Sequence, residues 1–447
     1  MDFWERLGFR ENPYNTKPLN VSSSDVDLLM GRNDEQIEFL NAIDSNKDGI
    51  LVLSGVPGVG KTSFFNVQQF LLESGDAPFG PRLLSARQLC PVNPYDEPRL
   101  IAERCVQSLC KSIQIYCSIT GGTLPPETKK ISEWINKRST ANYSLGLTVL
   151  GNGGSFGRQI TVSSIKETTY EGLVEVIEVM VSEVVSVLNF KGCFIALDNI
   201  ENLQEDELGE SLITFRDTLF SLDNVWWILI GQAGLNSLIE TKDPRISQRI
   251  SASIDLKPIT DEALKRAVDQ RVDKFHSGQE NGSSPIPEVI YTKLFESSNG
   301  EIRFVFKYCH DICLSLVKKV RTEMQKINNG WGEQLFNELM GNYFVKKEIG
   351  EKKCNELLKE LITENFHGLN LSQEIKGILR LIGEKKSVGV KDFKDFKSFG
   401  INTQNDFLHN YLTQLKDKNL LLRKTEGKLV KYQLRGIALI AIEQNLL

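Results

Sequence analysis

The stretch ILVLSGVPGVGKTS, at residues 50–63, decides the fold class of this chain. Its first four residues are apolar, which is typical of a buried strand. The following residues fit GxxxxGK[ST] in full, the pattern of a phosphate-binding loop that leads into a helix. Its glycines let successive N–H groups face a phosphate, and the helix adds its positive N-terminal end. The residues expected to contact a nucleotide here are Gly55, Val56, Pro57, Gly58, Val59, Gly60, Lys61, Thr62 and Ser63.

A second apolar stretch, residues 194–197, ends in the carboxylate of Asp198. A phosphate loop needs such an acidic strand end to hold Mg²⁺ and to polarise a water molecule. We therefore expect ATP and Mg²⁺ as ligands, with the metal at the Thr62 hydroxyl and at the water shell of Asp198. Lys61 should reach the β- and γ-phosphate oxygens.

The sequence leaves open which residue activates the attacking water. In many ATPases with this loop a glutamate follows the metal-binding aspartate, but here the next residue is Asn199. Glu201 is the candidate base, or else its carboxylate only stabilises the start of a helix through the helix dipole. Gln232 follows the apolar stretch 225–230 and is the candidate polar residue near the γ-phosphate, with Asn236 as second choice. A loop-capping amide is the alternative for this position.

These apolar stretches alternate with helical patterns, which predicts an α/β fold with a parallel sheet and right-handed crossovers. A chain of 447 residues is too long for one ordinary core, so two or three domains are expected. We expect a P-loop ATPase domain over residues 1–257. Within it, alternating apolar residues and glycines at 118–165 predict a β-hairpin insertion, which is either a mobile surface hairpin or one that touches a partner.

Five short motifs, in order along the chain, resemble those of AAA+ ATPases, and specifically of the origin-recognition and replication-initiator (ORC/CDC6-like) branch. The first is LMGRNDE at residues 29–35, similar to a box that lines the adenine pocket in that family. The phosphate loop and the strand ending at Asp198 are the second and third. Residues 243–249 resemble the stretch that carries the family's arginine finger, and residues 299–303 resemble its sensor-2 motif. The resemblance covers about residues 25–320, and more weakly the C-terminal domain.

The resemblance implies roles for further residues. Gly31 and Arg32 would line the adenine pocket. Arg249, or else Arg245, would reach the γ-phosphate of a neighbouring subunit, which implies a homo-oligomer. Arg303 would reach the γ-phosphate of its own subunit from a helical lid. Both arginine roles suit a guanidinium, which is always charged.

Asn199 departs from the acidic pair that is usual in this family, which argues against fast hydrolysis. The chain also resembles STAND-type switch ATPases, relatives that use ATP to change state and often act in bacterial immunity. The glycine-rich insertion adds to this second resemblance.

The C-terminal part, residues 371–447, is predicted to be a winged helix, after a helical lid at 258–330 and a helical connector at 331–370. Ser372 is expected to cap its first helix, and Thr403 is expected to cap its third helix, at 404–418. The hairpin at 420–432 would be the wing. This part has 14 Lys and Arg residues against 8 Asp and Glu residues, although the whole chain has a net charge of −5. The basic charge favours contact with double-stranded DNA through its phosphates, and contact with a protein is the alternative.

Composition excludes several other classes. Hydrophobic residues make up 40% and charged residues 25%, as in globular proteins, and the apolar runs are too short to span a bilayer. The start of the chain lacks the pattern of a signal peptide, so a cytoplasmic location and no membrane partner are expected. The eight cysteines have no CxxC spacing, which favours reduced thiols over a metal site.

Two functions therefore compete. The first is an ATP-dependent AAA+ protein that assembles or switches on DNA. The second is a slowly hydrolysing switch or adaptor that recruits an effector protein in a bacterial defence or mobile-element system. Hydrolysis stimulated by DNA favours the first, and slow turnover with assembly on a protein partner favours the second.

Overall fold

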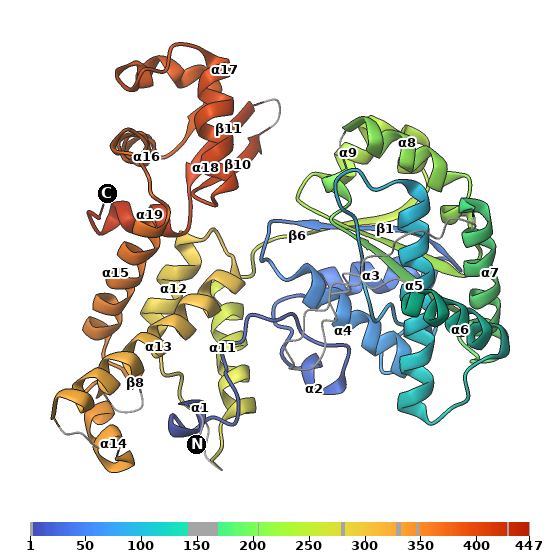
Figure 1. The fold of residues 1–447 in the computed structure, drawn as a ribbon, viewed down its shortest axis with the longest axis horizontal. Helices are drawn as coiled ribbons and strands as arrows, with labels where there is room; N and C mark the ends of the chain where they lie inside the picture. Colours follow the sequence, from blue (N-terminus) through green and yellow to red (C-terminus); the bar gives the residue numbers. More distant parts are fainter. Residues whose placement is uncertain are drawn as a thin grey trace. The chain divides into compact units, whose positions relative to one another are not determined.

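The computed structural model describes residues 3–141, 169–203, 205–278, 282–327, 332–345, 348–426 and 429–446. The chain forms two compact units, drawn in Figure 1. The first, here called the sheet unit, is Pro18–Lys257. The second, here called the helical unit, combines Met1–Lys17 with Pro258–Leu447. The chain therefore passes between the units twice, and each passage ends in a Lys-Pro step.

The sheet unit contains a parallel β-sheet, which confirms the predicted fold class. Within the described residues the sheet has six strands in the order β2-β4-β5-β1-β6, and β3 pairs with β4 beside β2. All of these pairs are parallel. The strand bounds are β1 Gly49–Gly55, β2 Leu83–Leu84, β3 Cys90–Pro91, β4 Gly192–Asp198, β5 Val225–Ile230 and β6 Ile250–Leu256.

Helices cover both faces of this sheet, as the side chains of β1 show. Ile50 and Val52 belong to one apolar core, and Leu51 and Leu53 belong to another on the opposite face. The first core includes side chains of α5 (Pro98–Thr120), α7 (Tyr170–Ser186) and α8 (Glu205–Arg216). The second includes side chains of α3 (Asn33–Ser45) and α4 (Lys61–Ser74). A sheet covered on both faces has strands that are apolar throughout, which is why β5 is VWWILI.

The predicted β-hairpin insertion at 118–165 is wrong in its first part. Helix α5 continues to Thr120, and a second helix, α6, covers Pro126–Ala141. The Glu183 carboxylate accepts the N–H groups of Glu127 and Thr128, at 2.7 Å each, and so satisfies donors at the start of α6. The alternating residues on which the hairpin prediction rested, 145–162, lie outside the described residues.

Short helices complete the sheet unit on either side of the main strands. They are α2 Ser23–Val26, η1 Ile200–Asn202, η2 Leu219–Ser221, α9 Leu235–Lys242 and α10 Pro244–Ser247.

The helical unit has one apolar core that extends along its whole described length. Its first part consists of α11 Asp261–Phe275, α12 Glu288–Ser297, α13 Ile302–Ile327, α14 Glu333–Gly341, β7 Phe344–Val345, β8 Glu348–Ile349 and α15 Glu351–Gly368.

The first residues of the chain pack in this helical unit, whereas the sequence placed them in the ATPase domain at 1–257. Trp4, in α1 (Phe3–Arg6), is buried in the helical core together with Phe9 and Tyr14. The Tyr14 hydroxyl lies 2.7 Å from the Ser284 hydroxyl. These contacts join residues about 270 positions apart, so local sequence patterns do not reveal them. The finer divisions predicted at 330 and 370 remain predictions.

The C-terminal part of the helical unit combines helices with a small antiparallel sheet of order β10-β11-β9. Ser372 and Thr403 cap α16 and α17 through their side chains, as predicted for Ser372 and Thr403. The winged-helix interpretation of this part remains a prediction. The elements are α16 Gln373–Lys385, β9 Val388–Gly389, η3 Val390–Phe399, α17 Gln404–Asp406, η4 Phe407–Leu412, α18 Thr413–Asp417, β10 Leu421–Glu426, β11 Leu429–Leu434 and α19 Ile437–Glu443.

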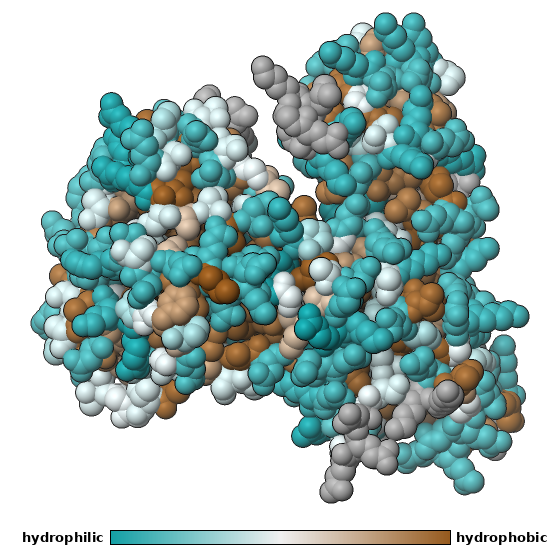
Figure 2. Space-filling model, turned by 180° about the vertical axis from the view of Figure 1, so that it is seen from behind, coloured by the Kyte–Doolittle hydropathy of each residue, from teal (hydrophilic) through white to brown (hydrophobic). Residues whose placement is uncertain are grey.

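Figure 2 shows one face of the molecule, on which hydrophilic side chains cover most of each unit and apolar ones are scattered among them. Across the described ranges, no helix combines the length and apolar character needed to span a bilayer. All eight cysteines are buried and free. Among the residues that the structure describes, no group of three or more metal-ligating side chains could hold an ion.

Candidate nucleotide-binding site

The phosphate loop lies between β1 and α4, as the sequence predicts. Strand β1 ends at Gly55, and α4 begins at Lys61. Gly58 has φ 77° and Gly60 has φ 104°, values that favour glycine. A Cβ atom at Gly55 would lie 2.6 Å from the carbonyl oxygen of Leu256, at the end of β6. Two of these glycines therefore allow the curl of the loop, and Gly55 allows its close approach to β6.

Lys61 and Ser63 have partners within the protein. The Lys61 ammonium donates to the carbonyl oxygens of Gly55, at 2.9 Å, and Val56, at 3.3 Å. The Ser63 hydroxyl accepts the N–H of Leu19 at 3.1 Å. Lys61 is thus folded back over its own loop, and the Ser63 hydroxyl anchors the start of the sheet unit.

The Arg32 side chain supports the phosphate loop by a hydrogen bond to the backbone of that loop. This side chain is only 4% exposed. Its guanidinium donates to the carbonyl oxygen of Val59 at 2.9 Å, to that of Lys257 at 2.7 Å, and to the Glu35 carboxylate at 2.8 Å. Arg32 and Glu35 also form an ion pair across one turn of α3, with Gly31 just before it at φ 68°. The predicted place of Gly31 and Arg32 in an adenine pocket remains a prediction.

The carboxylate predicted to bind the metal and the phosphate loop belong to strands on either side of β5. Asp198, half-buried at the end of β4, is in register with Ile230, and Ile230 is in register with Leu53 of β1. The carboxyl ends of parallel strands meet at one edge of a sheet, so β5 ends between the two predicted site elements. Asn199 follows with φ 60° and donates its N–H to Ile230 at 2.9 Å.

Glu201 contacts the backbone just beyond β5. One carboxylate oxygen accepts the N–H of Gln232 at 3.0 Å. The other oxygen is buried and makes no hydrogen bond within the described residues. A Cβ atom at Gly231 would lie 2.5 Å from this second oxygen, so the carboxylate fits only beside a glycine. The sequence predicted Glu201 and Gln232 as separate candidates and did not reveal the hydrogen bond between the Glu201 carboxylate and the Gln232 backbone N–H.

The candidate arginine fingers lie on the surface around α10. Arg245 and Arg249 are both exposed, and the Arg249 guanidinium donates to the carbonyl oxygen of Arg216 at 2.6 Å. Arg216 itself is ion-paired with Asp217 and with the buried Asp243. The hydrogen bond from Arg216 lowers the pKa of Asp217, and the charges of Arg249 and Arg245 add to this effect.

The structure groups only part of the predicted site. The phosphate loop, Asp198, Glu201 and Gln232 all belong to the sheet unit, with Asn236 half-exposed in α9. Arg303 is exposed in the first turn of α13, which belongs to the helical unit. Its predicted approach to the γ-phosphate therefore remains a prediction.

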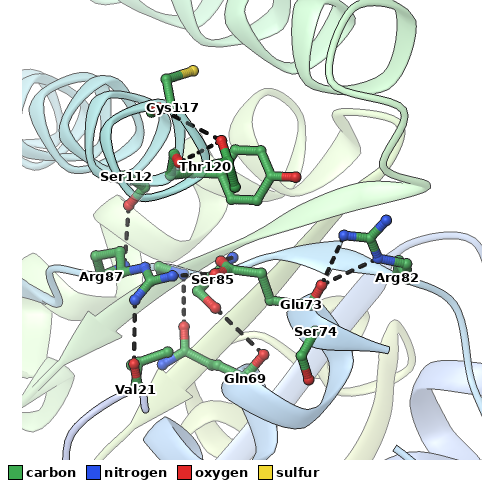
Figure 3. A network of polar contacts seen from close by, with 12 residues as sticks. Val21, Gln69, Glu73, Ser74, Arg82, Ser85, Arg87, Ser112, Cys117 and Thr120 are labelled. Atoms are coloured by element: carbon green, nitrogen blue, oxygen red, sulfur yellow. Dashed lines mark hydrogen bonds and ion pairs between the residues drawn. The ribbon is translucent and has the colours of Figure 1, made fainter. Parts of the chain in front are cut away.

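A buried polar network that the sequence did not reveal holds the helix after the phosphate loop (Figure 3). The Glu73 carboxylate of α4 is ion-paired with Arg87 and accepts the N–H of Ser85 at 2.9 Å. Gln69, one turn earlier, accepts the N–H of Ala86 at 2.6 Å. Arg87 also donates to the carbonyl oxygen of Val21 at 3.2 Å. The signal available in the sequence was the spacing of Gln69 and Glu73, which places both on one face of α4. Polar side chains on a buried helix face need hydrogen-bond partners.

Comparisons with known proteins give structural likeness only. No family model matches the chain, and no curated protein matches it. The chain is similar in structure to ORC and Cdc6 proteins. One is the ORC2 protein of Aeropyrum pernix in ADPNP–ADP complexes, at 12% identity and a TM-score of 0.45, with 97% of each chain covered. Another is the ORC1 protein of the same organism in complex with DNA, at 13% identity, 94% coverage of each chain and a TM-score of 0.45.

A third solved structure, Cdc6p from Pyrobaculum aerophilum, covers 93% of this chain and 95% of its own at 12% identity, with a TM-score of 0.37.

Proposed function

We propose that this chain binds ATP with Mg²⁺ at the loop of residues 55–63 and hydrolyses it to drive assembly or conformational change on DNA. The observation that carries the proposal is the phosphate loop itself, with its left-handed glycines and the helix that begins at Lys61. A loop of this kind turns its N–H groups toward an anion, and the helix N-terminus adds a favourable dipole.

The side chains near the loop fit a magnesium nucleotide. Mg²⁺ prefers oxygen ligands, and the Thr62 hydroxyl and the Asp198 carboxylate supply oxygens on the loop and at the end of β4. The bound metal would neutralise charge on the phosphates. Lys61 would exchange its bonds to the carbonyls of Gly55 and Val56 for bonds to the β- and γ-phosphate oxygens.

Glu201 is the candidate base, and its arrangement supports slow hydrolysis. Its first oxygen is occupied by the Gln232 N–H, so only the buried second oxygen remains to accept a proton. Asn199, at the position next to Asp198, has an amide and cannot act as a base. Turnover would therefore depend on small movements that bring water to Glu201.

Contact with double-stranded DNA is proposed for the C-terminal part of the helical unit. Residues 371–447 carry a net charge of +6, and Arg423 and Lys424 are exposed on β10. Such side chains would bind phosphates and give affinity without reading sequence. Arg249, exposed on the sheet unit, would complete the nucleotide site of a neighbouring copy in a homo-oligomer.

The test is ATP turnover by the purified full-length chain, with and without duplex DNA, beside the Lys61→Ala variant. Turnover that rises with DNA and vanishes in the variant supports the proposal. Turnover that persists in Lys61→Ala contradicts the site.

The alternative function is a nucleotide-held switch that recruits an effector protein. Two observations favour it. The residue after Asp198 is Asn199 and not a carboxylate, and the Glu201 carboxylate already accepts the N–H of Gln232. Tight ATP binding without turnover, with or without DNA, is the result that would favour this alternative.

A further inference from the structure

Both passages of the chain between the two units adjoin the phosphate loop. The first lies between Lys17 and Pro18, and the second between Lys257 and Pro258. Proline fixes its own φ and disfavours helical backbone in the residue before it. The backbone at each Lys-Pro step therefore has restricted dihedral angles. A displacement of the lysine, in one unit, can be transmitted through this step to the proline, in the other.

The first passage is held on the helix that begins at the phosphate loop. The Ser63 hydroxyl accepts the N–H of Leu19 at 3.1 Å, and the Asn66 side chain donates to the carbonyl oxygen of Leu19 at 2.7 Å. Leu19 is 5% exposed and packs with Leu28 and Val67. The backbone next to Pro18 is thus fixed to the first two turns of α4.

The second passage is held on the loop itself, through Arg32. One guanidinium nitrogen donates to the Val59 carbonyl, inside the loop, and another donates to the Lys257 carbonyl, the last of the sheet unit. The Ser54 hydroxyl donates to the Asp255 carboxylate at 2.9 Å, which adds a second tie between the ends of β1 and β6. A buried guanidinium that donates a hydrogen bond to each of these two carbonyls links them rigidly.

Within the helical unit, Pro258 contacts the turn between α12 and α13. A Cβ atom at Gly300, which has φ 82°, would lie 2.2 Å from the Pro258 Cβ atom. The same turn holds the end of β11. Asn299 accepts the Gln433 side-chain amide at 2.8 Å, and Glu301 is ion-paired with Arg435. A movement of Pro258 would therefore reach β11, which pairs with β10, the strand that carries the exposed Arg423 and Lys424.

We propose that Arg32 is a positioning residue that couples occupancy of the phosphate loop to the C-terminal part of the helical unit. The route is Val59, Arg32, the Lys257–Pro258 step, the turn at 297–301 and then β11. The inference rests on the proposed function, because a bound nucleotide supplies the displacement. When Lys61 leaves the carbonyls of Gly55 and Val56 for a phosphate, the loop backbone must adjust, and Arg32 carries that adjustment to Lys257.

Coupling of this kind is reciprocal. A ligand that binds β10 and β11 should change the affinity of the chain for ATP. ATP should change the affinity for that ligand by the same factor. A link that depends on two discrete bonds is also expected to fail when either bond is removed.

The experiment is hydrogen–deuterium exchange of the full-length chain, with and without a non-hydrolysable ATP analogue and Mg²⁺. Peptides covering residues 55–62, 297–303 and 433–437 are followed. In the unmodified chain, the nucleotide should slow exchange in the loop and change it in the two distant peptides by about fivefold or more.

Two variants break the route at different points. Arg32→Ala removes the link to Val59 and Lys257. Gly300→Ala places a methyl group against Pro258 and lies in the other unit, away from the phosphate loop. Gly300→Ala should keep the response at 55–62 and lose the responses at 297–303 and 433–437. Arg32→Ala should lose the same two distant responses, whatever it does to the loop that its guanidinium contacts. Arg321→Ala, an exposed arginine of α13, is the matched control and should behave like the unmodified chain.

The outcomes separate this inference from the proposed function. No response of the loop in the unmodified chain would overturn the proposed function itself. A loop that responds without any response at 297–303 and 433–437 would overturn the coupling alone, as would distant responses that persist in Gly300→Ala. If Arg32→Ala no longer binds nucleotide, the Gly300→Ala variant still decides the question.

Discussion

The carboxylate of Glu201 accepts the backbone N–H of Gln232 at 3.0 Å, so two residues from different strand ends form one element of the candidate site. Glu201 follows β4 and Gln232 follows β5, and these neighbouring strands end at the same edge of the sheet. The bond fixes the backbone next to the phosphate loop, because Gly231 itself donates to Leu53 of β1 at 3.1 Å.

This relationship predicts that Gly231 tolerates no side chain. In Gly231→Ala the new Cβ atom would lie 2.5 Å from the Glu201 carboxylate and 2.7 Å from Leu235. Overpacking of this kind costs about 1–3 kcal/mol of unfolding free energy. Chemical denaturation measures the loss. Gly209→Ala is the control, because a Cβ atom there meets nothing within 4 Å in α8 and should be neutral or stabilising. Equal effects of the two substitutions would contradict the packing argument.

Glu201→Gln should separate the structural role of this side chain from its chemical role. The amide oxygen can still accept the Gln232 N–H, so folding and ATP binding should be kept. If the carboxylate is the base, turnover should fall by about 10²-fold or more, a typical contribution of general-base catalysis. Glu201→Ala is the companion variant, which should also lose stability. Unchanged turnover in Glu201→Gln would mean that Glu201 has only a structural role, as the acceptor of the Gln232 N–H.

Arg249→Ala should spare ATP binding and impair turnover or assembly. An arginine supplied from a neighbouring subunit can accelerate phosphoryl transfer by roughly 10³-fold or more. Sedimentation velocity with and without ATP, together with turnover at several protein concentrations, measures both effects. Arg245→Ala is the matched control, since Arg245 is exposed on α10, and Arg249 is exposed just after that helix ends. If Arg245→Ala shows the loss instead, the role passes to that residue, and if neither does, the finger proposal is wrong.

Substitution of Arg423 and Lys424 by alanine should weaken binding of duplex DNA equally for all sequences. Each lost phosphate contact should reduce the slope of log K against log salt concentration by about 0.9. Fluorescence anisotropy over a range of salt concentrations gives this slope. Lys352→Ala with Lys359→Ala, two exposed lysines of α15, is the charge-matched control. An identical slope for both double variants would argue against DNA contact through β10.

The sequence predicted those parts of the fold that depend on neighbours along the chain. The strand, loop and helix around residues 50–63 and the carboxylate at the end of β4 follow from local patterns of apolar residues and glycine. The side-chain caps at Ser372 and Thr403 follow from the same local rules.

Contacts between distant residues could not be predicted in this way. Arg32 bonds to Lys257, 225 positions later, and this partner is fixed only when β6 pairs with β1. The bond between Glu201 and Gln232 depends likewise on the register of β4 and β5. Helix α6 was missed because the alternating residues that follow it outweighed the apolar Ile131, Trp134 and Ile135, which pack on the core at helical spacing.

The central claim is that the loop at residues 55–62 binds ATP, and calorimetric titration of the full-length chain with ATP and Mg²⁺ tests it most directly. Lys61→Ala and Lys352→Ala are measured beside the unmodified chain. We predict saturable one-site binding in the unmodified chain and in Lys352→Ala, and loss or severe weakening of binding in Lys61→Ala. Equal affinity in all three proteins would contradict the assignment of the site.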